Sequence, residues 1–141
     1  MNLRIELSQN PNEEQRNAIL APLRAHNVAK AGPSKFEPLA LLVRDEHDAI
    51  LGGLYGHTFY RWLFIELLAV PEQGRGQGIG SQLMQMAEDF ARKNDCVGIW
   101  LDTFSFQAPE FYRKVGYVEC GEIVDYPLGH KRHFFQKRLV G

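Results

Sequence analysis

The spacing of apolar and polar side chains changes several times along the chain, and these changes mark its elements. Between residues 62 and 70 an almost unbroken apolar run of strand length predicts a strand buried on both faces. From Ile79 to Phe90 apolar residues recur at helical spacing, with polar and charged residues on the other side. Between the two lies Gly74-Arg75-Gly76-Gln77-Gly78-Ile79-Gly80. The pattern therefore predicts a strand, a glycine loop and an amphipathic helix.

The N-terminal part shows two shorter patterns. Residues 3–7 alternate between apolar and polar side chains, which predicts a short half-buried strand. The segment Asn10-Pro11-Asn12-Glu13 then combines a capping residue, a proline at the first helical position and an acid three residues after the cap. We expect the helix that follows to kink or end at Pro22.

Residues 39–43 and 49–60 predict an antiparallel hairpin, and glycines at 52, 53 and 56 suggest a bulge or a close backbone approach there. The apolar segment 97–101 predicts a further strand. Because a helix connects it to the strand at 62–70, we expect these two strands to be parallel with a right-handed crossover. A short helix beginning at Pro109 and ending near Gly116, and two closing strands at 117–123 and 131–139, complete the chain.

Composition limits the classes of function. The 141 residues, 45% of them hydrophobic, are expected to form a single domain, 1–141. A formal net charge of −1 gives no electrostatic reason to expect a nucleic acid or an anionic membrane as partner. No apolar run reaches membrane-spanning length and the N-terminus lacks a signal-peptide core, so we expect a cytoplasmic protein. The isolated Cys96 and Cys120, and His130 and His133 on opposite faces of a strand, indicate no metal site.

The glycine loop is suited to a compact anion. Alternating glycines leave backbone N–H groups accessible, and the following helix directs its positive end at the same place, which favours a phosphate or pyrophosphate. A dinucleotide fingerprint would need glycine at Ser81 or at Ile79, and a Walker loop would need a Gly-Lys pair that the chain lacks. The remaining interpretation without a ligand is a turn that simply connects a strand to a helix.

Two motifs resemble the GCN5-related N-acetyltransferase (GNAT) family. The first is R-x-x-G-x-G at Arg75, Gly78 and Gly80. The second runs from Ser105 to Tyr117 and is similar to the family's N-x-x-A-x-x-x-Y pattern followed by an aliphatic residue, glycine and an aromatic; Ala108, Tyr112, Val115, Gly116 and Tyr117 match, and Ser105 stands where asparagine is usual. The resemblance covers about residues 49–117. It implies an α+β fold with a central mixed, mostly antiparallel sheet of about six or seven strands, flanking helices and a parallel strand pair at the cofactor site.

The resemblance also implies a site for acetyl-coenzyme A (acetyl-CoA), with no metal. Residues 68–70 would pair with the pantetheine arm and residues 75–81 would hold the pyrophosphate. The implied cofactor-binding residues are Leu68, Ala69, Val70, Arg75, Gly76, Gln77, Gly78, Ile79, Gly80, Ser81, Ser105 and Tyr112. Tyr112 would also be the general acid that protonates the departing thiolate, since a phenol is protonated at neutral pH. The alternative is that Tyr112 is a core aromatic beside Phe111.

A general base is harder to assign. Strand alternation places Glu66 on the same face as Phe64 and Leu68, in the middle of an apolar row, where a carboxylate is a candidate catalytic base. A carboxylate paired with a basic neighbour is an equally good interpretation of Glu66.

The function expected from these patterns is transfer of an acetyl group from acetyl-CoA to a primary amine by direct attack on the thioester. The amine could belong to a small molecule or to a protein, and the chain could be a monomer or a homodimer. Two alternatives stay open: a non-catalytic acyl-CoA sensor, and a nucleotide-binding module, which the failed fingerprints disfavour. Release of coenzyme A, and the ligand that raises the melting temperature, would distinguish them.

Overall fold

A computed structural model of the protein describes residues 1–140. The chain forms two compact units, the first from Met1 to Ser34 and the second from Lys35 onward. The first contains one helix, α1 (Glu13–Ala31). The second contains six strands and three helical segments: β1 (Glu37–Arg44), β2 (Ile50–Phe59), β3 (Trp62–Ala69), η1 (Glu72–Gly74), α2 (Ile79–Lys93), β4 (Gly98–Phe104), α3 (Pro109–Lys114), β5 (Val118–Val124) and β6 (Lys131–Arg138).

The N-terminal unit differs from its sequence-based description in three ways. Residues 3–7 form no strand and their apolar side chains are exposed, because alternation selects a buried face only where a partner strand and a core exist, and this unit has neither. The helix is capped by Asn12 rather than Asn10: the Asn12 side chain accepts from the Gln15 N–H at 2.8 Å, and the Gln15 side chain accepts from the Asn12 N–H at 3.2 Å. The helix also continues through Pro22, so one missing hydrogen bond does not end it.

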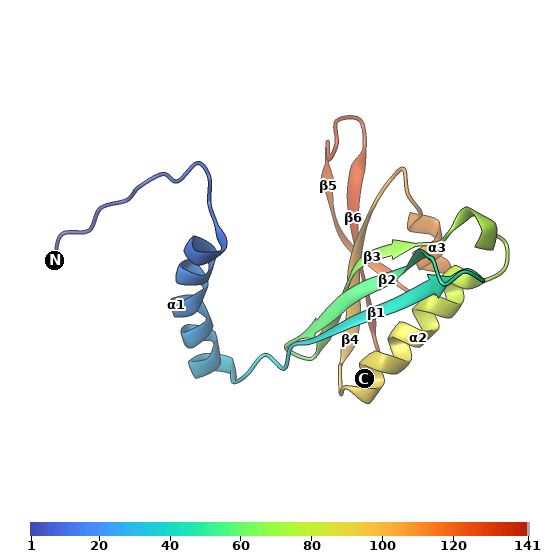
Figure 1. Ribbon diagram of the computed structural model, residues 1–141, viewed down its shortest axis with the longest axis horizontal. Coiled ribbons are helices and arrows are strands. Elements are labelled where there is room, and N and C mark those ends of the chain that lie inside the picture. The colour runs from blue at the N-terminus through green and yellow to red at the C-terminus, as the bar shows by residue number, and fades with distance from the viewer. Residues whose placement is uncertain (141) are drawn as a thin grey trace. The chain divides into compact units, whose positions relative to one another are not determined.

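The second unit is built on one six-stranded sheet in the order β1-β2-β3-β4-β6-β5 (Figure 1). Strands β3 and β4 are parallel and every other neighbouring pair is antiparallel. This confirms the α+β fold with a mostly antiparallel sheet, and the parallel pair joined by the amphipathic helix. Strand β6 lies between β4 and β5, so the C-terminal hairpin extends the sheet beyond the parallel pair.

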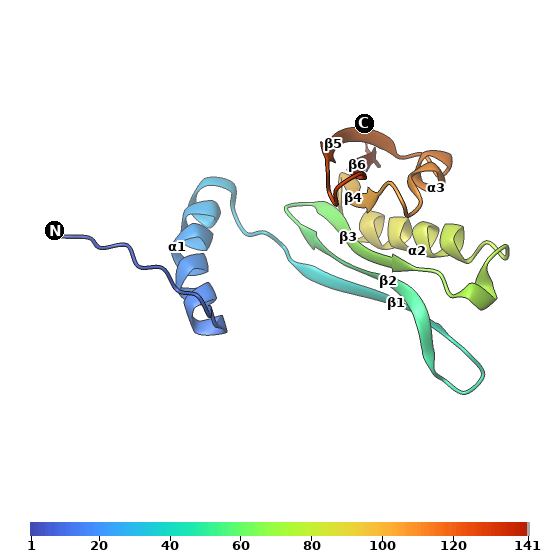
Figure 2. The same ribbon diagram turned by 90° about the horizontal axis from the view of Figure 1, so that it is seen from above.

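The core lies between the sheet and α2, which packs along one face of it (Figure 2). The buried face of α2 consists of Leu83, Met84, Ala87 and Ala91, whereas Met86 is 47% exposed. Beneath α2, the parallel strands contribute their most buried side chains, Leu63, Ile65, Ile99 and Leu101. Each such side chain contributes roughly 1.5–3 kcal/mol of hydrophobic stabilisation, so the parallel pair supplies a large part of the core beneath α2.

The pairing of β2 with β3 contains a bulge next to Gly56, one of the glycines that suggested it, and the bulged strand is β3. The register of β2 with β3 shifts between Tyr55 and Gly56, so that Tyr55 pairs with Leu67 and Gly56 with Ile65. A Cβ at Gly56 would collide with the carbonyl oxygen of Phe64, which explains why only glycine fits there. Glu66 is therefore the extra residue of the bulge, and β3 bends at this point.

Candidate active site

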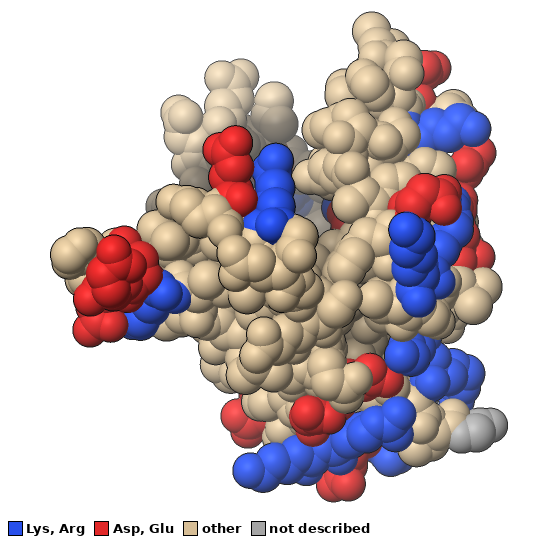
Figure 3. Space-filling view, turned by 90° about the vertical axis from the view of Figure 1, so that its right-hand side faces the viewer, with Lys and Arg blue, Asp and Glu red and all other residues tan. Residues whose placement is uncertain are grey.

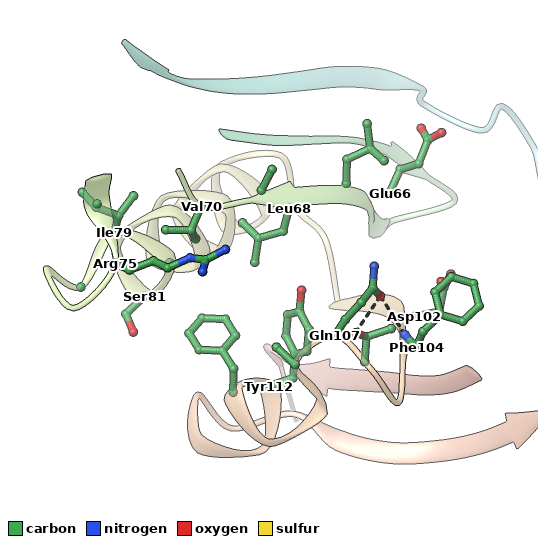
Figure 4. Close-up of a pocket in the computed structure, with 18 of the residues that line it drawn as sticks. Glu66, Leu68, Val70, Arg75, Ile79, Ser81, Asp102, Phe104, Gln107 and Tyr112 are labelled. Carbon is green, nitrogen blue, oxygen red and sulfur yellow. Dashed lines mark hydrogen bonds between the residues drawn. The ribbon is translucent and has the colours of Figure 1, made fainter. Parts of the chain in front are cut away.

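A cleft opens where the two parallel strands separate. Their pairing runs from Trp62 opposite Gly98 to Ile65 opposite Leu101 and then stops. Beyond that point, β3, the glycine loop, the start of α2, the end of β4 and α3 surround a cavity of about 850 Å³, a size suited to a cofactor or drug-sized ligand (Figure 4). The edge of β3 that faces β4 is unpaired along this cavity, so its backbone groups can bind an extended ligand chain.

The glycine loop forms one end of the cavity. Gly76 and Gly78 have φ angles of +81° and +75°, in the left-handed region that favours glycine, and a Cβ at either would meet no atom within 4 Å. Gly78 is the N-cap of α2 without a capping side chain, and the first turn of α2 contains no acidic residue. The N–H groups of this turn and the helix dipole are therefore directed at the loop without a competing carboxylate.

Arg75 provides a side-chain cation at the same end. Figure 4 shows its guanidinium reaching over the cavity between Ile79 and Leu68. Among residues 1–140, no hydrogen bond or ion pair engages it. An unpaired guanidinium beside a helix N-terminus is suited to the phosphates of a ligand.

Most of the residues predicted to bind the cofactor line this one cavity: Leu68, Ala69, Val70, Arg75, Gly76, Gly78, Ile79, Gly80, Ser81 and Tyr112. Gln77 and Ser105 do not line it. The amide of Gln77 donates to the Gln73 carbonyl at 3.0 Å, within the loop itself. The hydroxyl of Ser105 accepts from the Lys131 N–H at 3.1 Å and lies 3.4 Å from His130 Nδ1, so it fixes the start of β6 instead.

Tyr112 is both a core aromatic residue and a residue with a hydroxyl in the cavity, the two positions that the sequence left open. Its ring is 7% exposed and contacts Phe111, Tyr117 and Phe135, which makes it part of the core. Its hydroxyl nevertheless points into the cavity (Figure 4) and forms no hydrogen bond with any residue from 1 to 140. Burial, and to a lesser extent the negative charge of Asp102, raise the pKa of Tyr112 from 10.0 to about 12. The hydroxyl is therefore protonated and available as a donor.

Glu66 lines the cavity, but not in the surroundings expected from strand alternation. Because the bulge falls at Glu66, the side chain leaves the apolar row and is exposed. Figure 4 shows the carboxylate pointing away from Tyr112. The expectation of a carboxylate embedded among apolar side chains is thus wrong, although Glu66 has no ion-pair partner among residues 1–140.

The end of the cavity opposite the glycine loop is closed by side chains from strands far apart in sequence. Arg132 of β6 binds both carboxylate oxygens of Asp102, at 2.9 and 2.8 Å, and donates to the Tyr126 hydroxyl at 2.9 Å. The Arg132 guanidinium also lies about 5.5 Å or less from the ring centroids of Phe104, Tyr126 and Phe134. Sequence reasoning missed Arg132 because no local motif marks a residue of the last strand as a neighbour of β4.

Several charged side chains elsewhere on the second unit form ion pairs. On the hairpin of β5 and β6, Glu119, Glu122 and His133 place three potential ligand atoms within 4.8 Å of one another. Glu119 already binds Arg113 at 2.6 Å and His133 at 3.1 Å, and these partners lower its pKa. The cluster is therefore an ion-pair network. Figure 3 likewise shows basic and acidic side chains interspersed on the face it presents. In the described part of the chain, no helix is long and apolar enough to cross a bilayer.

Comparison with known proteins agrees with this geometry. The sequence profile of the Acetyltransferase (GNAT) family matches residues 5–117. An acetyltransferase from Agrobacterium fabrum is 38% identical, over 94% of this chain and 97% of its own. Blasticidin-S acetyltransferase from Streptomyces morookaense is 40% identical, over 89% of this chain and 92% of its own.

A solved structure leads to the same family. The crystal structure of a putative acetyltransferase from Agrobacterium tumefaciens is 36% identical and superposes with a TM-score of 0.90, covering 97% of this chain and all of that one. The glycine loop before α2, the separating parallel strands and the cavity hydroxyl of Tyr112 are thus found in a chain that resembles acetyltransferases over nearly its whole length. The chain belongs to the GNAT family of acetyltransferases and is an acyltransferase.

Proposed function

We propose that this protein transfers the acetyl group of acetyl-CoA to a primary amine by direct attack of the amine on the thioester. The observation that carries the proposal is the meeting of three features in one cavity: an unpaired strand edge, an uncapped helix N-terminus behind a glycine loop, and a buried tyrosine hydroxyl. We also propose that residues 1–141 act together as one acetyltransferase domain, since the family match extends across both compact units.

The residues present are suited to acetyl-CoA. The free edge at the end of β3 and the residue after it, Leu68 to Val70, would pair with the amides of pantetheine, and Arg75 with the N–H groups up to Ser81 would hold the pyrophosphate. Gly80 contributes by its lack of a side chain, because a Cβ there would press on Phe111 at 3.2 Å and on Val70 at 3.4 Å. Gln77 and Ser105, which lie outside the cavity lining, would support the loop and the start of β6 without touching the cofactor.

Tyr112 would stabilise the departing sulfur. As the amine nitrogen bonds to the carbonyl carbon and the C–S bond breaks, negative charge develops on sulfur, and the Tyr112 hydroxyl can donate a hydrogen bond to it. A tyrosine with a pKa of about 12 is a weaker acid than a thiol of pKa about 8.5. Donation of a hydrogen bond is therefore the main contribution of Tyr112, and the proton that ends on sulfur comes from the attacking amine, which loses one as the amide forms.

An alkylammonium must lose a proton before it can attack, and Glu66 is the carboxylate on the cavity wall. Because its side chain points away from Tyr112, we propose that Glu66 acts through an intervening water molecule. Its negative charge, not neutralised by any basic residue from 1 to 140, would also attract the cationic form of the acceptor.

We propose a small-molecule amine as the acceptor. One similar chain is named for acetylating blasticidin S and another, 37% identical over 79 residues, for acetylating streptothricin, rather than a protein or a nucleic acid. The aromatic rings and the Arg132–Asp102 pair restrict the acceptor end of the cavity, which favours a compact substrate over a protein surface.

The test is a panel of amines of different charge and size, with acetyl-CoA as donor and release of coenzyme A as the readout. Turnover of at least one primary amine is expected, with acetylation at nitrogen shown by mass spectrometry. Thermal stability should rise more with acetyl-CoA than with pantetheine, which lacks the pyrophosphate, and a ligand at ~100 times its Kd should add roughly 2.7 kcal/mol. Saturable binding without release of coenzyme A from any amine would instead indicate a sensor.

A further inference from the structure

Gln107 has a side-chain amide that is held in place by hydrogen bonds and that takes no part in the proposed steps of acetyl transfer. It follows β4 in the turn that leads to α3, and it lines the cavity. Its side-chain oxygen accepts two hydrogen bonds, from the Phe104 N–H at 2.8 Å and from the Thr103 hydroxyl at 3.2 Å. The backbone N–H of Gln107 donates to the Phe104 carbonyl at 2.9 Å, and this hydrogen bond closes the turn. The Gln107 side chain is thus held over the end of β4.

These contacts determine which way the amide faces. A backbone N–H can only donate, so the Gln107 atom beside Phe104 N must be the oxygen, and the amide nitrogen must lie on the other side. Figure 4 shows this nitrogen pointing across the cavity toward β3. Among residues 1–140, nothing accepts a hydrogen bond from it. Gln107 therefore presents two N–H donors to the cavity from a fixed position.

The position of Gln107 identifies the atom that these donors would meet. In Figure 4 it lies between Tyr112 and the Asp102–Phe104 end, so it is the next polar group beyond Tyr112 on the way from the glycine loop. If the thioester sulfur lies at Tyr112, the acetyl group is the next part of the ligand in that direction. The acetyl group has a single hydrogen-bonding atom, its carbonyl oxygen, which can only accept.

We propose that the side-chain nitrogen of Gln107 donates a hydrogen bond to the thioester carbonyl oxygen and stabilises the negative charge that develops there during transfer. The inference rests on the proposed acetyl transfer and assigns a catalytic residue to it. A donor that is already anchored needs no reorganisation when the charge appears, which is the condition for a large electrostatic contribution. No covalent change occurs at Gln107: the carbonyl C–O bond becomes single as nitrogen attacks and double again as sulfur leaves.

Two substitutions distinguish a hydrogen bond donated by the Gln107 nitrogen to the ligand from the hydrogen bonds that anchor the Gln107 oxygen. Gln107→Glu keeps an oxygen that can accept from Phe104 N and the Thr103 hydroxyl, but replaces the donor with an acceptor. Gln107→Met removes both functions at similar size. Gln85→Met is the matched control, because it removes an exposed amide from α2, outside the cavity lining. For each variant, kcat, the KM of the amine, the Kd of acetyl-CoA and the melting temperature are measured.

If Gln107 stabilises the carbonyl oxygen, kcat falls about 10²- to 10³-fold in both Gln107 variants, while the KM of the amine and the Kd of acetyl-CoA stay within about threefold of the parent. Gln107→Glu then also retains the parental melting temperature. The proposal is overturned if Gln107→Glu keeps parental kcat, which would leave only an anchoring role, or if the KM of the amine rises while kcat is unchanged, which would indicate acceptor recognition. If the parent itself acetylates no amine, the proposed function fails and this inference fails with it.

Discussion

The two ends of the cavity are built in different ways. The end that we propose for the cofactor, here the cofactor end, comes from one continuous segment, Leu68 to Ser81, and presents mainly backbone: a free strand edge, glycines with positive φ and an uncapped helix N-terminus. The end that we propose for the amine, here the acceptor end, is assembled from side chains of β3, β4, the following turn and β6. Backbone recognition suits a ligand that all members of a family share, whereas a wall of side chains can change its specificity one residue at a time.

The two ends also differ in how their charges are balanced. Arg75 at the cofactor end has no ionic partner in the described part of the chain, so its charge is available to an anionic ligand. Arg132 at the acceptor end is fully engaged by Asp102, Tyr126 and the neighbouring rings. Arg75 can thus form its strongest contact only with a ligand, while Arg132 holds a wall in place. Substitutions at the two ends should therefore have separable effects on the two substrates.

The largest effect is expected at the loop, from Gly78→Asp. The new carboxylate would face the pyrophosphate, and like charges in close contact cost several kcal/mol, so acetyl-CoA affinity should fall more than about 100-fold by titration calorimetry. Gly78→Asn is the control, because asparagine tolerates the φ of +75° about as well and carries no charge. Equal losses in both variants would show that backbone conformation, and not charge, is responsible. Full affinity in Gly78→Asp would place the phosphates elsewhere.

Tyr112→Phe acts at the boundary between the two ends and should lower kcat by about 10²- to 10³-fold, because it removes the hydroxyl that donates to the departing sulfur. The ring that packs on Phe111 and Phe135 is retained, so the Kd of acetyl-CoA should change little. A variant keeping more than about half of the parental turnover would remove Tyr112 from the mechanism.

From the raised pKa of Tyr112 we also predict how the turnover and the stability of the parent protein depend on pH. The pKa of Tyr112 is about 12, so its hydroxyl stays protonated in the mildly alkaline range. Turnover should therefore not decline there through ionisation of Tyr112. The folded state favours the neutral phenol, so the corresponding stability is present below pH 10.0 and is lost as the pH rises toward about 12. Denaturant titrations of parent and Tyr112→Phe across that range would show the difference.

Asp102→Asn should affect the acceptor end alone. The amide keeps the shape of the carboxylate but leaves the Arg132 charge uncompensated beside the cavity, which repels a cationic amine by on the order of 1–2 kcal/mol. We expect the KM of the amine to rise about tenfold with the Kd of acetyl-CoA unchanged. Glu122→Gln is the matched control, since it removes the same charge from the ion pair with Lys131, outside the cavity lining. A parallel change in acetyl-CoA affinity would contradict the separation of the two ends.

A comparably small effect, on kcat rather than on the KM of the amine, is expected from Glu66→Gln. If Glu66 removes the amine proton only through water, kcat should fall less than in Tyr112→Phe, by about tenfold near neutral pH. The loss should shrink as the pH approaches the pKa of the amine, about 10.4 for an alkylamine, because the acceptor is then already neutral. A loss that is larger than that of Tyr112→Phe and independent of pH would mean that Glu66 contacts the amine directly.

The sequence predicted the elements that form the glycine-loop end of the cavity because their signals are local. The apolar run at 62–70, the glycine spacing and the helical period that follows are properties of neighbouring residues, and each has one structural solution. The same locality explains the errors. Residues 3–7 alternate correctly for a strand, but a strand also needs a partner. The alternation of β3 is interrupted at Glu66, where the bulge falls. That bulge depends on how Gly56 of another strand approaches Phe64.

By itself, the sequence determined the family, the order of most elements and the glycine loop that lies at one end of the cavity, since these depend on periodicity and on backbone freedom at glycine. Only the tertiary structure decided that Gln77 and Ser105 lie outside the cavity lining, that Arg132 neutralises Asp102, and that the Gln107 amide faces the cavity. The physical reason is that a side chain's partner depends on strand order and register. The position of β6 beside β4 brings together residues 30 apart in the chain, and no local pattern encodes that distance.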